Sequence, residues 1–130
     1  LRSSSLVPLK DVDGVAMVDK KIKKITLADN QSAVTTGIRV SASSGTAVIV
    51  KYKIERGSDF RTGTFTIVGK EGTAPSHNDD YEETGDVGVT LTVDADALDS
   101  TAGNETFDVN YATTSTGTAA TMDFQITEIV

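Results

Sequence analysis

Apolar and polar residues alternate most regularly over residues 46–56 (TAVIVKYKIER). Charged residues fill most of one parity, whereas the other parity is apolar: Val48, Val50, Tyr52 and Ile54. A strand points successive side chains to opposite faces, so this pattern predicts a strand with one apolar and one charged face. We therefore predict that residues 46–56 form the central strand of an antiparallel sheet, with the apolar parity on a core.

Other segments alternate in the same way, at residues 38–40, 60–68, 87–93, 107–111 and 120–126. Because Ser43, Ser44 and Gly45 form a turn signal, we expect residues 38–40 and 48–54 to form a hairpin. So many short strands separated by turns predict an all-β fold. We expect a two-sheet antiparallel β-sandwich, immunoglobulin-like or jelly-roll-like, with a small barrel as the alternative.

The apolar parities of these segments predict a single core over residues 20–130, which is enough chain for one domain. The residues expected to be buried together are Val50, Tyr52, Ile54, Phe65, Val89, Leu91, Val109 and Phe124. Tyr111 has the inward parity of its strand, so we assign it to the core as well.

Three segments lack a regular period. We interpret residues 1–19 as an N-terminal arm or linker, in which the apolar run at residues 14–18 is a possible edge strand. Residues 69–86 (GKEGTAPSHNDDYEETGD) are expected to be a long loop, because such a stretch exceeds an ordinary hairpin connection. A second connection is expected at residues 95–104, with one helical turn near Ala97.

The chain has a net charge of −7, and that charge is unevenly distributed. Residues 1–70 contain all 12 basic residues and 6 acidic ones, whereas residues 71–130 contain 13 acidic residues. The two halves can pair within one sheet or between neighbouring copies. Net negative charge argues against nucleic acid and anionic membranes as partners, and the short apolar runs argue against membrane insertion.

Four lysines, Lys20, Lys21, Lys23 and Lys24, surround Ile22. One interpretation is an edge strand protected from aggregation by lysine, and the other is a basic interaction site for an acidic partner. Because these lysines adjoin the arm, we predict that residues 1–24 contact another protein chain. The lysines would then lie near acids of residues 79–99.

Two groups of acids could supply oxygen ligands to calcium: Asp79 and Asp80 in the first, and Asp94, Asp96 and Asp99 in the second. Neither group fits a twelve-residue calcium-binding loop, since no glycine stands where that loop turns. Solvated or salt-bridged surface acids are the favoured interpretation, with calcium as the alternative. We therefore expect no cofactor and no metal site.

No arrangement of residues points to catalysis. His77 is the only histidine and there is no cysteine, so the usual zinc ligands are lacking. No glycine-flanked nucleophile follows a strand, and dense acids arise without a glycosidase pair. Tyr81, with acids beside it, is the aromatic residue most plausibly offered to a partner. We expect a protein that is not an enzyme.

Several short motifs together resemble a known kind of module. They are residues 25–31 (ITLADNQ), Thr36-Gly37, 48–56 (VIVKYKIER), 62–65 (TGTF), 85–90 (GDVGVT) and 121–129 (TMDFQITEI). Over residues 22–130 the chain resembles small β-sandwich modules of tail-fibre and other virion proteins of tailed bacteriophages. It departs from them in its acidic second half and in residues 69–86.

The resemblance implies a structural or adhesive virion component, in a tail fibre, an appendage or the capsid surface, with no catalytic residues to carry over. Its expected partners are other virion subunits, as a homo-oligomer such as a trimer, and a host-surface receptor. The alternative is a bacterial cell-surface or secreted adhesin module, for which bound calcium would be more expected.

Overall fold

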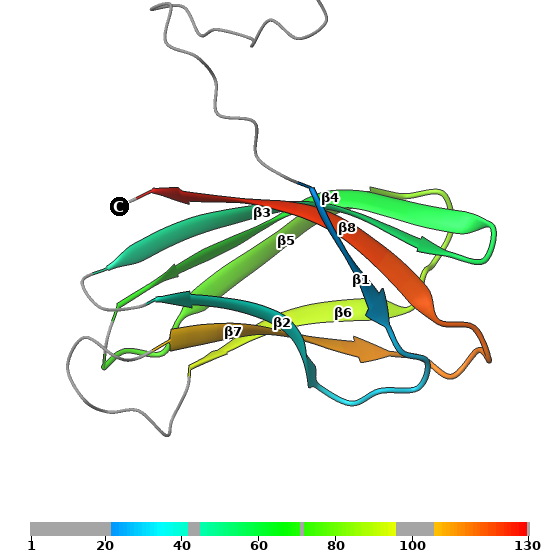
Figure 1. Cartoon of the computed structure of the whole chain (residues 1–130), viewed down its shortest axis with the longest axis horizontal. Coiled ribbons are helices and arrows are strands. Elements are labelled where there is room, and N and C mark those ends of the chain that lie inside the picture. Colours follow the sequence, from blue (N-terminus) through cyan, green and yellow to red (C-terminus); the bar gives the residue numbers. More distant parts are fainter. Residues whose placement is uncertain (1–21, 42–44, 71, 96–105, 130) are drawn as a thin grey trace, which may run out of the picture.

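The computed structural model describes residues 22–41, 45–70, 72–95 and 106–129. In these ranges eight strands form two antiparallel sheets, and no helix is present. The larger sheet lies above the smaller one in Figure 1, and the space between them is filled by side chains from both. The predicted all-β sandwich of two antiparallel sheets is confirmed.

The two sheets are built from strands that are distant in sequence. The five-stranded sheet has the order β1 (Lys23–Leu27), β8 (Ala120–Ile129), β3 (Thr46–Arg56), β4 (Asp59–Gly69) and β5 (Ser76–Glu83). The three-stranded sheet has the order β2 (Val34–Ser41), β7 (Thr106–Thr113) and β6 (Val89–Ala95).

Strand β3 occupies the middle of the larger sheet, as its sequence pattern predicts. It pairs with β4 along its whole length and with β8 from Ala47 to Glu55. Its even-numbered residues are buried, whereas Lys51, Lys53 and Glu55 are exposed on the outer face. Alternating burial on a strand with two neighbours makes β3 the element on which the larger sheet is built.

The predicted hairpin between residues 38–40 and 48–54 is wrong. Strand β2 lies in the smaller sheet and pairs with β7, whereas both edges of β3 are taken by β4 and β8. Residues Gly57 and Ser58 close the β3–β4 hairpin, and Gly57 has a φ of 62° that suits such a tight turn. Ile38 and Val40 face the same core from the opposite sheet, so an apolar parity alone did not identify the pairing partner.

The prediction that residues 69–86 form a loop is also wrong, because β5 runs through them. Its register on β4 extends from Arg61 opposite Glu83 to Val68 opposite Ser76. No apolar alternation marks β5, because it is an edge strand whose inward positions carry polar and aromatic side chains. Backbone pairing with β4 stabilises it in place of an apolar face.

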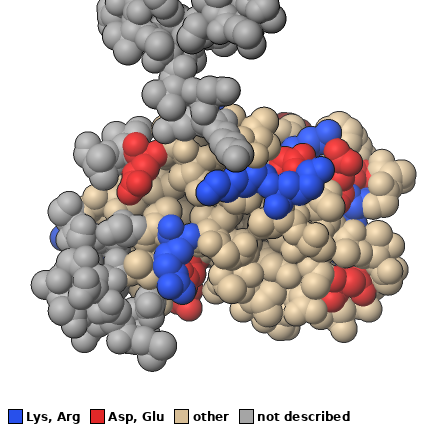
Figure 2. Space-filling view, viewed as in Figure 1, with Lys and Arg blue, Asp and Glu red and all other residues tan. Residues whose placement is uncertain are grey.

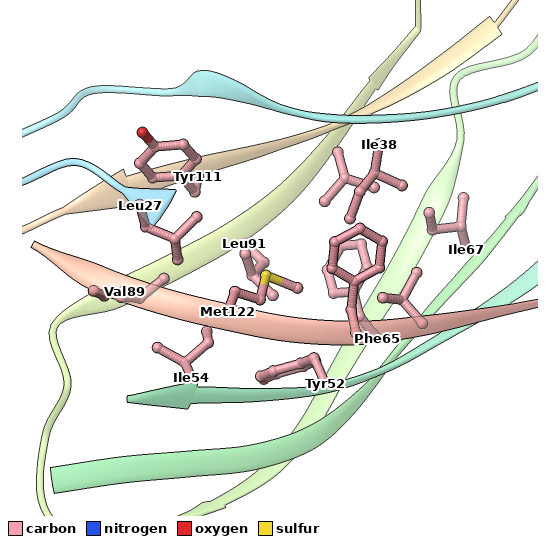
Figure 3. Close-up of a cluster of buried hydrophobic side chains, with 14 of the residues drawn as sticks. Leu27, Ile38, Tyr52, Ile54, Phe65, Ile67, Val89, Leu91, Tyr111 and Met122 are labelled. Carbon is pink, nitrogen blue, oxygen red and sulfur yellow. The ribbon is translucent and has the colours of Figure 1, made fainter. Parts of the chain in front are cut away.

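The core is a single cluster, and all eight residues predicted for it are buried. Figure 3 shows side chains from the two sheets pointing toward one another, among them Phe65, Met122 and Leu91. Tyr52 and Tyr111 are also buried, at 4% and 6% exposure, which confirms their assignment to the core.

Several predicted features lie outside the described residues. They are the arm at residues 1–19 with its apolar run at residues 14–18, Lys20 and Lys21, Asp96 and Asp99, and the helical turn near Ala97.

Candidate functional site

Of the acids that suggested a calcium site, those that the structure describes do not gather in one place. Because Asp79 and Asp80 are adjacent on strand β5, their side chains point to opposite faces of the sheet. Asp79 is half-buried on the inner side, and Asp80 is exposed on the outer face. Asp94 lies on β6 in the other sheet. Within the described ranges, no three His, Cys, Asp or Glu side chains lie close enough together to hold a metal ion.

Asp79 belongs to a polar cluster at the margin of the core. It accepts a hydrogen bond of 2.6 Å from the hydroxyl of Tyr52, and its other carboxylate oxygen lies 3.9 Å from Nη1 of Arg61. Arg61 is only 3% exposed, and its Nε and Nη2 each lie 2.9 Å from Oε2 of Glu83. We name Tyr52, Arg61, Asp79 and Glu83 the polar cluster.

Burial changes the acidity of two members of the polar cluster. It raises the pKa of Asp79 above its usual value, although the hydrogen bond from Tyr52 and the charge of Arg61 act in the opposite direction. Burial also raises the pKa of the Tyr52 hydroxyl, and the bond to Asp79 raises it further. The Tyr52 hydroxyl therefore stays protonated and donates to Asp79, so the Asp79 carboxylate has a structural role.

Tyr81 contributes to the same region in two ways. Its ring lies 3.9 Å from the guanidinium carbon of Arg61, so the ring covers the buried cation. The side chain is nevertheless 43% exposed. Tyr81 is therefore partly structural and partly accessible, and its predicted contact with a partner stays a prediction.

His77 has no arrangement that favours catalysis among the described residues. Its ring lies 5.3 Å from that of Phe65 on the neighbouring strand, and the residue is exposed. The cross-strand position opposite Ile67 explains this packing. The geometry assigns His77 to the edge of the core.

Lys23 and Lys24 lie on β1, which is an edge strand of the larger sheet. Both are exposed, and Nζ of Lys24 lies 3.8 Å from Asp123 on β8. This position agrees with the interpretation of an edge strand protected by lysine. A groove of about 610 Å³ runs beside β1 towards β2, with Lys23, Arg39, Ile38 and Ile126 in its lining.

Opposite charges from the two halves of the chain pair within one molecule. Lys24 pairs with Asp123, Arg39 with Asp108 at 2.7 Å, and Arg61 with Glu83. Figure 2 shows that basic and acidic side chains adjoin on the visible face. Intramolecular pairing therefore accounts for part of the asymmetric charge in the sequence.

One structural residue was not recognised as such from the sequence. Arg56, 7% exposed at the end of β3, donates hydrogen bonds to Asp29 at 2.6 Å and to the carbonyls of Val87, Thr114 and Thr118 at 3.0, 2.7 and 2.8 Å. It therefore fastens three connecting segments at one end of the sandwich. The sequence did contain a signal for this role, because Arg56 is a basic residue at the last position of the otherwise apolar, inward-facing parity of residues 46–56.

Asp29 extends this connection. Its carboxylate accepts backbone hydrogen bonds from Thr116 at 2.8 Å and from Gly117 at 3.1 Å. The bond from Thr116 is the largest influence on the pKa of Asp29, and the net effect lowers that pKa. The motifs at residues 25–31, 48–56 and 85–90 thus meet around Arg56, where their roles are structural.

In the described part of the chain, no helix is long and apolar enough to cross a membrane. A comparison with protein-family models finds no match, and no curated protein matches the sequence.

Proposed function

We propose that this chain is a non-enzymatic structural or adhesive module of a tailed-bacteriophage virion, in a tail fibre, an appendage or the capsid surface. It acts through contacts with other virion subunits or with a host surface. The resemblance of residues 22–130 to such modules is the reason for proposing a virion, and the arrangement of ionisable side chains supports a role in contacts.

The observation that carries this proposal is the position of the ionisable groups. The buried ones, Arg56 and Arg61, are held by acids and carbonyls within the fold. The exposed ones, such as Lys51, Asp80 and Glu82, stand on a sheet face. Charges spread over a rigid face favour recognition of another surface over chemistry at one atom.

The proposal is tested by fractionation of an infected culture. Mass spectrometry should find this protein in purified particles, at a constant copy number per particle. Recovery from the cell envelope and not from particles would contradict the proposal, and would favour a bacterial adhesin.

The effect of calcium on stability distinguishes the virion module from the bacterial adhesin in solution. Because the described acids do not converge, we expect millimolar calcium to leave the melting temperature of the chain unchanged. The measurement is differential scanning calorimetry with calcium and then with a chelator. A rise in melting temperature that the chelator reverses would favour the adhesin, and Asp94→Asn would show whether that residue takes part.

A further inference from the structure

The outer face of the larger sheet carries three parallel stripes of different charge. On this face β3 presents the basic residues Lys51 and Lys53, β4 presents Thr62 and Thr64, and β5 presents acids. The registers align them in rows across the strands. Lys51 lies opposite Thr64, and Thr64 lies opposite Asp80.

The next row repeats the same order of charge. Lys53 lies opposite Thr62, and Thr62 lies opposite Glu82. The face is therefore net positive along β3, where Lys51 and Lys53 outnumber Glu55, neutral along the middle strand and negative along the third. We name this surface, made of the outer side chains of β3, β4 and β5, the striped face.

The charges of the striped face are largely unused within the molecule. Among the ion pairs of the described residues, none includes Lys51, Asp80 or Glu82. Lys53 lies 2.8 Å from Glu55, and 5.1 Å above the ring of Phe60. Exposed apolar groups stand at the two ends of the middle stripe, with Phe60 at 41% and Val68 at 54% exposure.

We propose that the striped face binds the striped face of a second copy of this chain. A two-fold axis parallel to β4, midway between the copies, would place β3 of each copy over β5 of the other. Lys51 would then face Asp80 of the other copy, and Lys53 would face its Glu82. This is an isologous contact, in which one patch is complementary to itself.

The charge pattern selects this axis over the alternative. An axis across the strands would place β3 over β3 and β5 over β5, so that lysines would face lysines and acids would face acids. Like charges in direct opposition disfavour an interface. With the axis along β4, Phe60 and Val68 each face their own equivalents, which adds apolar contacts at both ends of the stripe.

The size of the overlap sets the expected strength. Three strands about 4.8 Å apart, overlapping over about eight residues of about 3.3 Å each, give roughly 400 Å² per copy. Interfaces below about 1,200 Å² in total belong to weak complexes. The contact should therefore be weak between free chains and effective where an assembly holds many copies together.

Charge reversal tests the pairing. One variant, Lys51→Glu with Lys53→Glu, makes the charges of the striped face all acidic. A second, Asp80→Lys with Glu82→Lys, makes the face predominantly basic, with Glu55 remaining on β3. A control, Asp94→Lys with Glu128→Lys, adds the same positive charge at exposed sites away from the striped face. Sedimentation of the full chain at about 1 mM, in low and high salt, measures association.

We expect the native chain to form a salt-sensitive dimer, and each striped-face variant alone to be monomeric. An equal mixture of the acidic and basic variants should dimerise. The control, whose striped face is unchanged, should dimerise alone as the native chain does. Circular dichroism checks folding. Thr64→Arg, a single change on the proposed axis, should also abolish the dimer because two cations would meet.

A native chain that stays monomeric, a striped-face variant that dimerises alone, a mixture of the acidic and basic variants that stays monomeric, or a monomeric control would overturn the pairing. The inference deepens the proposed function by naming a partner, but its failure is distinguishable. A monomeric chain that is still recovered from particles would reject the striped-face contact and leave the virion proposal in place.

Discussion

The polar side chains at the margin of the core, such as Tyr52 and Asp79, stabilise the fold by bonding to one another. Tyr52 is the clearest case, because its ring fills the core while its hydroxyl reaches Asp79 on the edge strand. The same hydrogen bond connects β3 to β5 across the intervening strand β4. A polar bond to a half-buried carboxylate thus extends the core where apolar packing ends.

Removing only the hydroxyl separates these two roles. Tyr52→Phe should lower the free energy of unfolding by about 1.5–3 kcal/mol, because it leaves a half-buried carboxylate without its donor. Tyr111→Phe is the matched control, since its hydroxyl accepts a bond of 3.0 Å from the neutral backbone nitrogen of Ala28. Urea unfolding measures both variants, and equal losses would show that the charge of Asp79 contributes nothing.

The pKa values of two aspartates should lie on opposite sides of the ordinary aspartate value. Burial raises the pKa of Asp79, so its protonation adds stability as the pH falls from above the folded pKa to below the unfolded value of about 3.9. The pKa of Asp29 is lowered, so its contribution is present above about pH 3.9 and is lost as the pH falls through the folded pKa.

Carboxyl carbon NMR measures both titrations in one experiment. Asp79 should titrate above its usual value, and further above it in Tyr52→Phe, because the lost hydrogen bond favours the charged form. Coincident midpoints for Asp29 and Asp79 would refute the burial assigned to Asp79.

At the scale of the strands, the sequence was most informative where alternation was strong. Residues 46–56 were placed as a central strand, and the inward parity of Tyr52, Phe65 and Leu91 was correct. Strand β5 could not be found in this way, since its inward positions are His77, Asp79, Tyr81 and Glu83. Asp79, Tyr81 and Glu83 are compensated by Arg61, 18 to 22 positions earlier, and no local pattern contains that information.

The pattern of apolar residues also could not identify which strands pair with one another. An apolar parity shows which face of a strand is buried, but it does not show which sheet contains that strand. Ile38 therefore suited a hairpin with β3 as well as its actual place beside β7. Asp79 and Asp80 were grouped in one loop for a related reason, whereas on strand β5 these adjacent residues point to opposite faces.

Gly63 makes the close approach of β4 and β5 possible. It lies between Tyr52 and Tyr81 in the register, and a Cβ at this position would stand 2.7 Å from Cβ of Tyr81 and 2.8 Å from the Tyr52 hydroxyl. Gly63→Ala should therefore cost about 1–3 kcal/mol of stability, as overpacking does. Thr66→Ala, on the outer face of β4, is the control.

Thermal unfolding and hydrogen exchange measure the Gly63→Ala effect. We expect faster exchange of β5 amides in this variant than in Thr66→Ala, because β5 must move away from β4. Unchanged stability and exchange would mean that the two strands do not approach as closely as the structure indicates.

At the scale of the whole molecule, the asymmetric charge of the sequence has two outcomes. Part of it is neutralised inside one chain, through pairs such as Arg39 with Asp108 and Arg61 with Glu83. Other described charges stand on open sheet faces, where Lys51 and Asp80 are separated by one neutral strand. A sandwich of this kind is suited to repeated contact with other copies or other subunits.

The most direct test of the central proposal is immunogold electron microscopy of purified phage particles, with antibodies against the folded chain. The account predicts gold at regularly repeated positions on a tail, an appendage or the capsid surface. Particles without label, together with labelled envelopes of uninfected cells, would contradict it.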